Sequence, residues 1–143
     1  MIIYGEGELR GELESLIAEL HLENRVFLPG STKNVADTIK SAKLFVLSSD
    51  YEGMPKSLME AMALGIPCIS TDCPCGGPRM LLKNHSNECL SDVNDFEKFS
   101  QKIYFLISNL GKSLIIGQDL KNYAGLFSPD KVFLEWFYYL HEC

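Results

Sequence analysis

The sequence predicts an α/β fold: a doubly wound parallel sheet between two layers of helices, three layers in all. Short apolar strand patterns alternate with helical patterns as far as Leu90, and the patterns after Asp92 are only helical. Strands joined by helices in this order form βαβ units and therefore a parallel sheet. The run Leu44–Leu47 is continuously apolar, which is typical of a strand buried on both faces. With 143 residues, we expect one domain over residues 1–143.

The first part of the chain contains two strand–helix units. Residues 1–4 form an apolar strand that ends in Gly5-Glu6-Gly7, and residues 8–20 carry apolar side chains at helical spacing. Residues 26–28 are a second strand, which we expect Pro29-Gly30 to stop. Residues 35–41 are the second helix.

The middle of the chain continues the alternation. The strand 44–47 is followed by a polar loop and a helix over 56–64, which Gly65 closes as a C-terminal cap. Pro67 leads into a strand over 68–70, then a loop rich in glycine and proline, and a helix that starts at Pro78. Residues 89–90 are the last predicted strand.

Three helices complete the chain, over 96–110, 113–123 and 129–141. The last is apolar nearly all round, with Trp136 among several aromatic residues. We expect it to dock on its own sheet. Aromatic rings left exposed there would drive self-association.

Composition excludes several classes of function. The net charge is −6, so we expect no broad basic face and no nucleic-acid partner. No apolar run is long enough to span a bilayer. Five cysteines in a chain without secretory features indicate reduced thiols and a cytoplasmic protein. Cys73, Cys75, His85 and Cys89 could supply zinc ligands, but their spacing fits no common site, so we expect no metal.

The loops that follow the strands converge on one edge of the sheet, because parallel strands have their carboxyl ends on the same side. Ligands of such sheets bind at these carboxyl ends. The helix that starts near Lys56 presents unpaired N–H groups and a positive dipole end there, which suits an anion. With a net negative chain, single residues such as Lys33, Lys56 or Arg79 would assist. Glu52 lies before this helix start and Glu60 one turn into it.

The two glutamates allow three interpretations. Ser57 and Glu60 could form a capping box. A glycosidase acid/base pair would need a second wall for the cleft, and nothing in the chain provides one. In the third interpretation the carboxylates accept hydrogen bonds from sugar hydroxyls.

Elsewhere, Gly5 and Gly7 are two glycines of a dinucleotide fingerprint, but Arg10 occupies the place of the third and disfavours a nicotinamide site.

In order and spacing, about the first 82 residues resemble the donor-binding region of GT-B glycosyltransferases of the retaining, glycosyltransferase family 4 type. The resemblance rests on Tyr51-Glu52-Gly53-Met54-Pro55, Leu58–Ala63 with Glu60, and Gly65-Ile66-Pro67, which look like that family's E-x7-E region. Gly5-Glu6-Gly7, Val26–Gly30, Leu44–Ser49 and Cys68–Arg79 extend it. The resemblance implies a Rossmann-like domain, the C-terminal half of a GT-B enzyme.

The resemblance also implies roles for individual residues. Glu60 would hold the ribose hydroxyls of the donor nucleotide, and Glu52 would lie against the donor sugar as the catalytic-site carboxylate. Gly53 and Met54 would line the sugar and diphosphate with backbone amides, while Pro55 contributes shape alone. The turn formed by Phe27, Leu28 and Pro29 would carry the base through backbone groups, and Gly5 and Gly7 would lie near the phosphates.

By this likeness the substrate is a nucleotide diphosphate sugar, a UDP-sugar, and no cofactor or metal is required. The sugar would go to a polysaccharide, glycolipid or similar acceptor. The family's basic pair and its N-terminal acceptor domain are missing from this chain, so we expect the chain alone to be inactive. We expect it to belong to a larger, cytoplasmic enzyme, whose membrane contact at the inner face would come through the missing half or the acceptor. The alternative is a non-catalytic nucleotide-binding or interaction module with the same fold.

Overall fold

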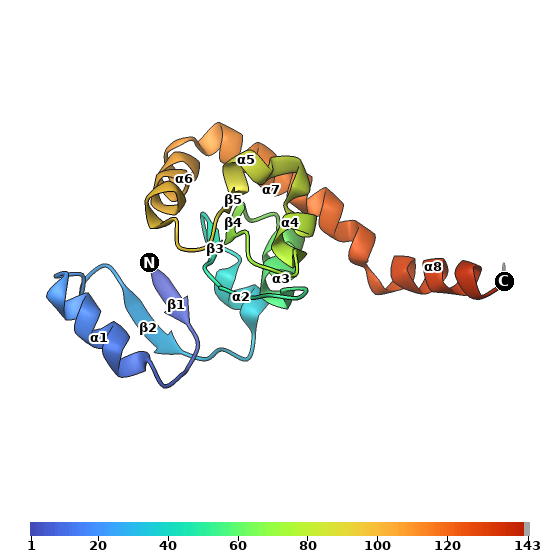
Figure 1. Cartoon of the computed structure of the whole chain (residues 1–143). Coiled ribbons are helices and arrows are strands. Elements are labelled where there is room, and N and C mark those ends of the chain that lie inside the picture. The colour runs from blue at the N-terminus through green and yellow to red at the C-terminus, as the bar shows by residue number, and fades with distance from the viewer. Residues whose placement is uncertain (142–143) are drawn as a thin grey trace. The chain divides into compact units, whose positions relative to one another are not determined.

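The computed structural model describes residues 1–141, and these residues form an α/β fold of parallel strands and helices (Figure 1). Contacts within the chain divide it into two compact units, Met1–Thr38 and the part from Ile39 onward. Hydrogen-bonded strands form one sheet in each unit. The predicted fold class is confirmed.

The first unit is a small βαβ arrangement. Strand β1 (Ile2–Tyr4) leads to helix α1 (Arg10–Glu19), and strand β2 (Phe27–Gly30) returns parallel to β1. The ladder pairs Ile2 with Phe27 and Tyr4 with Gly30, so β2 accommodates one extra residue between these pairs. The prediction that Pro29-Gly30 stops this strand is wrong, because the irregular register tolerates a proline that cannot donate a hydrogen bond.

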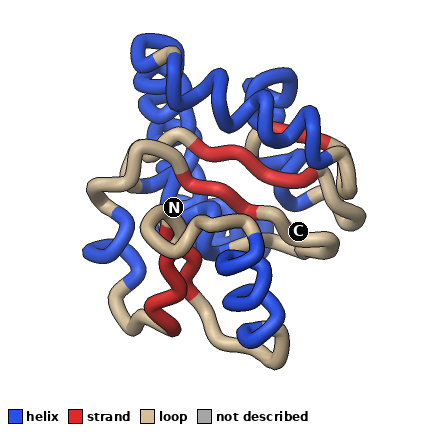
Figure 2. Tube along the Cα trace, turned by 90° about the vertical axis from the view of Figure 1, so that its left-hand side faces the viewer, coloured by secondary structure: helices blue, strands red, loops and turns tan. Residues whose placement is uncertain are grey.

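The second unit contains a three-stranded parallel sheet in the order β3-β4-β5. Strand β3 is Phe45–Leu47, β4 is Cys68–Thr71 and β5 is Leu90–Ser91. All four residues of β4 are buried, so helices cover both of its faces (Figure 2). Helix α3 (Lys56–Ala63) packs against β3 and β4, and α6 (Phe96–Ser108) packs against β4 and β5.

The remaining elements are short helices and two long ones, α7 (Leu110–Ala124) and α8 (Pro129–His141). Helix α2 (Val35–Ile39) joins the two units, and α3 packs closely against α7. The other elements are α4 (Gly77–Leu81), η1 (Lys83–His85), α5 (Ser86–Cys89) and η2 (Gly125–Phe127). Cys89 ends α5, so the predicted strand over 89–90 begins one residue later, where Leu90 pairs with Ser70.

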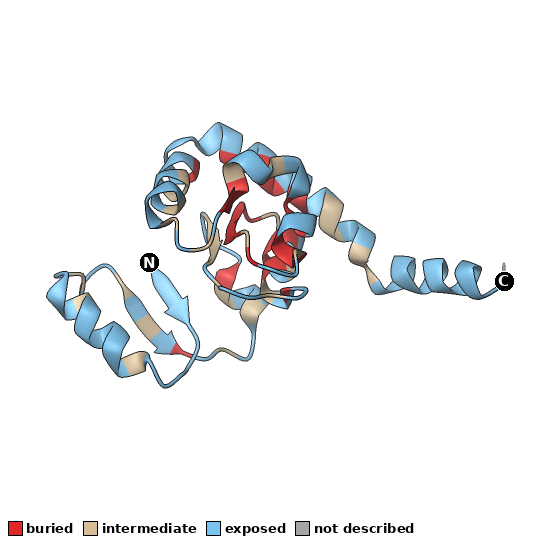
Figure 3. Ribbon diagram, in the orientation of Figure 1, coloured by how far each residue is buried: buried red, intermediate tan, exposed pale blue. Residues whose placement is uncertain are grey.

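The core lies in the second unit, around β4 and the helices beside it (Figure 3). Leu58 and Met62 of α3, Ile69 of β4 and Ile116 of α7 are all fully buried. Helix α8, in contrast, has no buried residue. The prediction that α8 docks on its own sheet is therefore wrong: α3 and α6 already pack on the strands.

No helix among residues 1–141 is both long enough and apolar enough to cross a membrane.

Candidate functional site

The loop between β3 and α3 ends in a helix start that no side chain caps. Pro55, in an extended conformation, precedes the first helical residue Lys56, and it has no side chain that could accept from the first-turn N–H groups. The capping-box interpretation of Ser57 is wrong, since the helix begins one residue before Ser57 and no side-chain cap bond forms. These N–H groups thus keep the anion-binding capacity of a free helix N-terminus.

Glu52 is fixed within this loop. The Ser49 hydroxyl donates to Glu52 Oε1 over 2.8 Å, and the Glu52 side chain is half-buried. The Thr71 hydroxyl at the end of β4 donates to the Ser49 carbonyl. Strand β4 therefore positions the loop, and the loop positions the carboxylate.

Glu60 lies on the exposed side of α3. The buried residues Leu58, Ala61 and Met62 define the opposite, core-facing side. The Glu60 carbonyl accepts from the Leu64 N–H within the helix, but no hydrogen bond or ion pair joins the Glu60 carboxylate to any residue in the range 1–141. Its carboxylate is free to accept hydrogen bonds from hydroxyls of a ligand.

The loop after β4 meets the loop after β3 at close range. A Cβ atom at Gly77 would lie 1.6 Å from the Gly53 carbonyl oxygen and 3.2 Å from Pro55 Cδ, so only glycine fits. The exposed Tyr51 phenol donates a hydrogen bond to the Cys75 sulfur, and this bond raises the pKa of Tyr51. Within the second unit, the expected convergence of these two loops is therefore present.

Arg79 does not serve as a free anion-binding group. Its guanidinium donates to both Asp72 carboxylate oxygens, at 2.6–3.0 Å, and this contact raises the pKa of Arg79. Lys56, at the first position of α3, is exposed and remains available.

The first unit holds the other predicted donor-binding residues. Gly5 has a positive φ of 139°, and its N–H donates to the Gly30 carbonyl over 3.0 Å. Arg10 donates to the Leu28 carbonyl over 2.8 Å and pairs with Glu6 over 3.0 Å. Arg10 thus ties the glycine turn to β2, which explains why arginine occupies the place of a third glycine.

The Leu28 carbonyl, one of the backbone groups expected to meet the base, is already an acceptor for Arg10. Phe27 is exposed, as are Gly7 and Pro29. That the loops of both units line one donor site stays a prediction.

The cysteines are thiols in different environments. Cys68 and Cys89 are buried, and burial raises both pKa values, that of Cys89 to about 12. Cys73 is buried and Cys75 exposed. Among residues 1–141, no three His, Cys, Asp or Glu side chains gather in a way that could hold a metal ion.

One group of residues escaped the sequence analysis: Ser91 and Asp92 at the end of β5, with Lys98 and Lys102 of α6, line a cavity of about 470 Å³. The two lysines stand four residues apart, so helical periodicity places them on one side of α6. This spacing was visible in the sequence, but only the structure brings the pair beside β5.

The α/β fold and the uncapped helix start at its sheet edge define a domain of the GT-B, Rossmann-like type, as found in glycosyltransferases. The chain belongs to the family described as glycosyl transferases group 1, which matches residues 1–123.

Individual relatives agree with this assignment. The chain is 38% identical to an uncharacterized glycosyltransferase of Methanocaldococcus jannaschii over 132 residues, which is 92% of this chain and 31% of the relative. It is 33% identical to the UDP-Gal:alpha-D-GlcNAc-diphosphoundecaprenol alpha-1,3-galactosyltransferase of Escherichia coli over 99 residues, 68% of this chain and 25% of the relative. The chain thus spans about a quarter to a third of the length of these relatives.

Solved structures show the same fold. The crystal structure of the Staphylococcus aureus TarM G117R mutant in complex with Fondaparinux, alpha-GlcNAc-glycerol and UDP matches with a TM-score of 0.85 and 27% identity. The match covers 95% of this chain and 28% of that one. The Anabaena protein Alr3699/HepE, solved with UDP-glucose, matches with a TM-score of 0.85 at 23% identity over 99% of this chain and 40% of its own, which supports the fold alone.

Proposed function

We propose that this chain forms the donor-binding part of a retaining, metal-independent glycosyltransferase of the family 4 type, and that its donor is a UDP-sugar. The observation that carries the proposal is the uncapped start of α3, with Glu52 held before it and the exposed Glu60 four residues into the helix. The E. coli relative is named for a UDP-Gal donor, and TarM was solved with UDP. Both names support a UDP-sugar as the ligand.

In this proposal the diphosphate lies against the first-turn N–H groups of α3, and Lys56 adds a positive charge. Glu60 accepts hydrogen bonds from the ribose hydroxyls, and Glu52 lies against the donor sugar. Gly53 and Met54, both exposed, present backbone N–H groups to the sugar and diphosphate. Charge on the departing diphosphate would be stabilised by these fixed donors.

The complete enzyme would add an acceptor-binding domain N-terminal to this chain, and the acceptor would be a glycan or lipid-linked sugar. We place that enzyme in the cytoplasm, with membrane contact only through the acceptor or the other domain. The chain by itself would bind the donor and transfer nothing.

The proposal is tested by titrating UDP into the ¹⁵N-labelled chain and following amide shifts. We expect shifts at Gly53, Met54 and the first turn of α3, unchanged when a metal chelator is added. Glu60→Ala should weaken UDP binding roughly tenfold, because a charge-assisted hydrogen bond is lost. Glu135→Ala, on the exposed surface of α8, is the matched control and should bind like the unchanged chain. Shifts that avoid the α3 start, or equal affinity in both variants, would overturn the proposal.

A further inference from the structure

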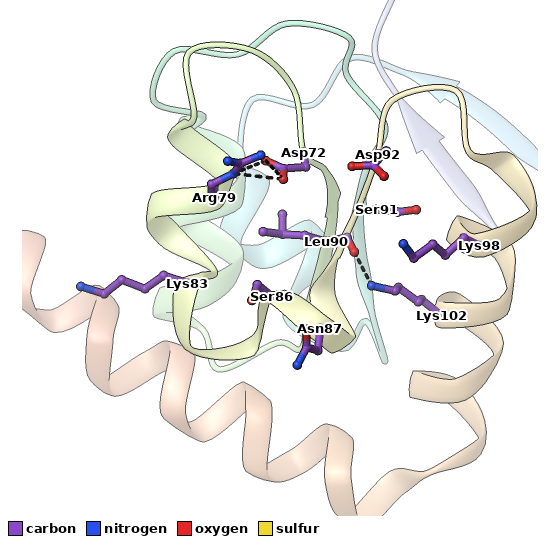
Figure 4. A pocket seen from close by; sticks show the side chains of 10 residues that line it. All are labelled: Asp72, Arg79, Lys83, Ser86, Asn87, Leu90, Ser91, Asp92, Lys98 and Lys102. Atoms are coloured by element: carbon purple, nitrogen blue, oxygen red, sulfur yellow. Dashed lines mark hydrogen bonds and ion pairs between the residues drawn. The ribbon is translucent and has the colours of Figure 1, made fainter.

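The polar cavity beside β5 lies at the carboxyl ends of β4 and β5, bounded by α6 (Figure 4). Its volume is about 470 Å³, within the range of small-molecule sites. None of the residues proposed above for the donor lines it. The residues that line it are Asp72, Arg79, Lys83, Ser86, Asn87, Leu90, Ser91, Asp92, Lys98 and Lys102.

The cavity is predominantly cationic, with four basic side chains against two carboxylates. Arg79 and Asp72 neutralise each other in a bidentate pair. Lys83 points away from the cavity, and its Nζ lies 5.1 Å from the centroid of the Tyr123 ring. The charges that remain directed at the cavity are those of Lys98 and Lys102 on α6 and that of Asp92.

Two lysines of α6, Lys98 and Lys102, reach from this helix toward β5 (Figure 4). Lys102 Nζ donates to the Leu90 carbonyl, whereas no hydrogen bond or ion pair joins Lys98 Nζ to the residues that the structure describes. Both lysines also line a smaller adjoining cavity of about 330 Å³.

The placement of these lysines opposes the stability of the helix that carries them. Lys98 lies in the first turn of α6, where its backbone N–H donates to the Asp95 cap over 3.0 Å and the helix dipole disfavours a cation. Lys102 follows one turn later, and like charges at this spacing repel. The pKa of Lys102 is lowered first by burial and then by Lys98, although Cys89, Glu88 and Asp92 act in the opposite direction. An anion between the two ammonium groups would remove this repulsion.

The Ser91 hydroxyl adds an independent observation. Ser91 is only 2% exposed, and its hydroxyl has no hydrogen-bond partner among the described residues. A buried hydroxyl without a partner carries a free-energy cost that a bound acceptor would remove. In Figure 4 the Ser91 side chain points toward the side of β5 on which Lys98 and Lys102 lie. The Lys98 side chain on this side is exposed.

We propose that this cavity binds a phosphate monoester of a small polar group, with the phosphate between Lys98, Lys102 and the Ser91 hydroxyl. A phosphate monoester carries up to two negative charges and three acceptor oxygens, which match two ammonium groups and one hydroxyl. Leu90 is the one apolar residue of the lining, and no aromatic ring takes part, so the rest of the ligand is polar. The cavity has room for a group of the size of a hexose beside the phosphate.

Amide-detected NMR titration of the ¹⁵N-labelled chain tests this proposal with three probes: glucose 1-phosphate, inorganic phosphate and glucose. We expect glucose 1-phosphate to shift the amides of Ser91, Asp92 and the first two turns of α6, and glucose to shift none of them. Lys98→Gln should weaken binding roughly tenfold by removing one charge-assisted contact. Lys131→Gln, the same charge change on the exposed surface of α8, is the control and should leave binding unchanged.

Lys98→Gln removes no bond of the fold, since Lys98 Nζ has no partner in the described chain, and the dispersed amide spectrum verifies that the variant is folded. Tighter binding of glucose 1-phosphate than of inorganic phosphate supports an ester as the ligand. Equal binding of both means that the cavity holds the free anion and overturns the ester. Absent shifts at these amides, or equal losses in Lys98→Gln and Lys131→Gln, overturn the site itself. UDP shifts at the α3 start are read separately, so the donor proposal stands or falls independently.

Discussion

The two compact units of this chain both contain parallel strands joined by helices, but their interiors are very different. Every buried apolar side chain of the described residues belongs to the unit that begins at Ile39. Helix α1 of the first unit has no buried residue, and Leu9 and Leu20 are more than half exposed. A pair of strands with one helix is too little to enclose a core.

The difference teaches that an amphipathic pattern and burial are separate properties. Apolar residues recur at helical spacing in both α1 and α3, yet only those of α3 meet a sheet covered on both faces. Stability therefore resides in the second unit, and the loop that carries Glu52 depends on it.

Matched leucine substitutions test this comparison with the largest expected effect. Leu58→Ala, at a fully buried position of α3, should lower the free energy of unfolding by about 3 kcal/mol, because it removes buried apolar surface and leaves a cavity. Leu16→Ala, at a position of α1 that is 48% exposed, should cost less than about 1 kcal/mol. Urea unfolding followed by circular dichroism measures both. Equal losses would show that the first unit contributes to a common core.

A second pair of substitutions compares glycines in the two units. Gly77→Ala would place Cβ 1.6 Å from the Gly53 carbonyl oxygen, so one of the two loops must move, at a cost of about 1–3 kcal/mol. Gly11→Ala, in α1, meets nothing within 4 Å and should stabilise the helix by up to about 1 kcal/mol. Thermal unfolding gives both values. If Gly77→Ala keeps full stability, the two loops are not held in close contact.

Because Gly53 belongs to the proposed donor site, Gly77→Ala should also weaken UDP binding, while Gly11→Ala should not. A variant that loses stability but keeps UDP affinity would separate the packing of the loops from the site.

Local signals in the sequence were sufficient for most elements. Gly65 was predicted to end α3, and it does so at φ +77° with its N–H on the Met62 carbonyl and the Ile66 N–H on the Ala61 carbonyl. This cap depends on residues within one turn, and only glycine adopts the conformation without strain. The start of α3 near Lys56 was also predicted from nearby residues, since a proline and a glycine precede it.

Features that depend on neighbours far along the chain could not be predicted in this way. The start of β5 is decided by its pairing with β4, and the hydrogen bond of Arg10 to Leu28 joins residues eighteen positions apart. The cavity beside β5 is likewise formed by a strand end and a helix face that only folding brings together. Periodicity identified α8 as a helix but gave no information about what it contacts.

The smallest expected effect concerns an ion pair that joins two helices of the second unit, α5 and α7. In the first unit, by contrast, Arg10 pairs with Glu6 and Glu14, each only four residues away. Lys112 of α7 lies 3.0 Å from Glu88 of α5 and lowers the pKa of Glu88. The pair therefore contributes stability above the pKa that Glu88 has in the unfolded chain, and that contribution is lost as the pH falls through the lower pKa of the folded state.

Because 26% of the Glu88 side chain and 46% of Lys112 are exposed, solvent screens the pair, and Lys112→Gln should cost only about 0.5 kcal/mol at neutral pH. Urea unfolding across a pH series measures the difference, with Lys131→Gln as the control for a changed net charge. The loss should shrink to nothing in acid, where Glu88 is protonated in both states. A loss that persists there would mean that Lys112 stabilises the fold through packing of its aliphatic stem. The two units would then differ in burial alone and not in whether their ion pairs join separate helices.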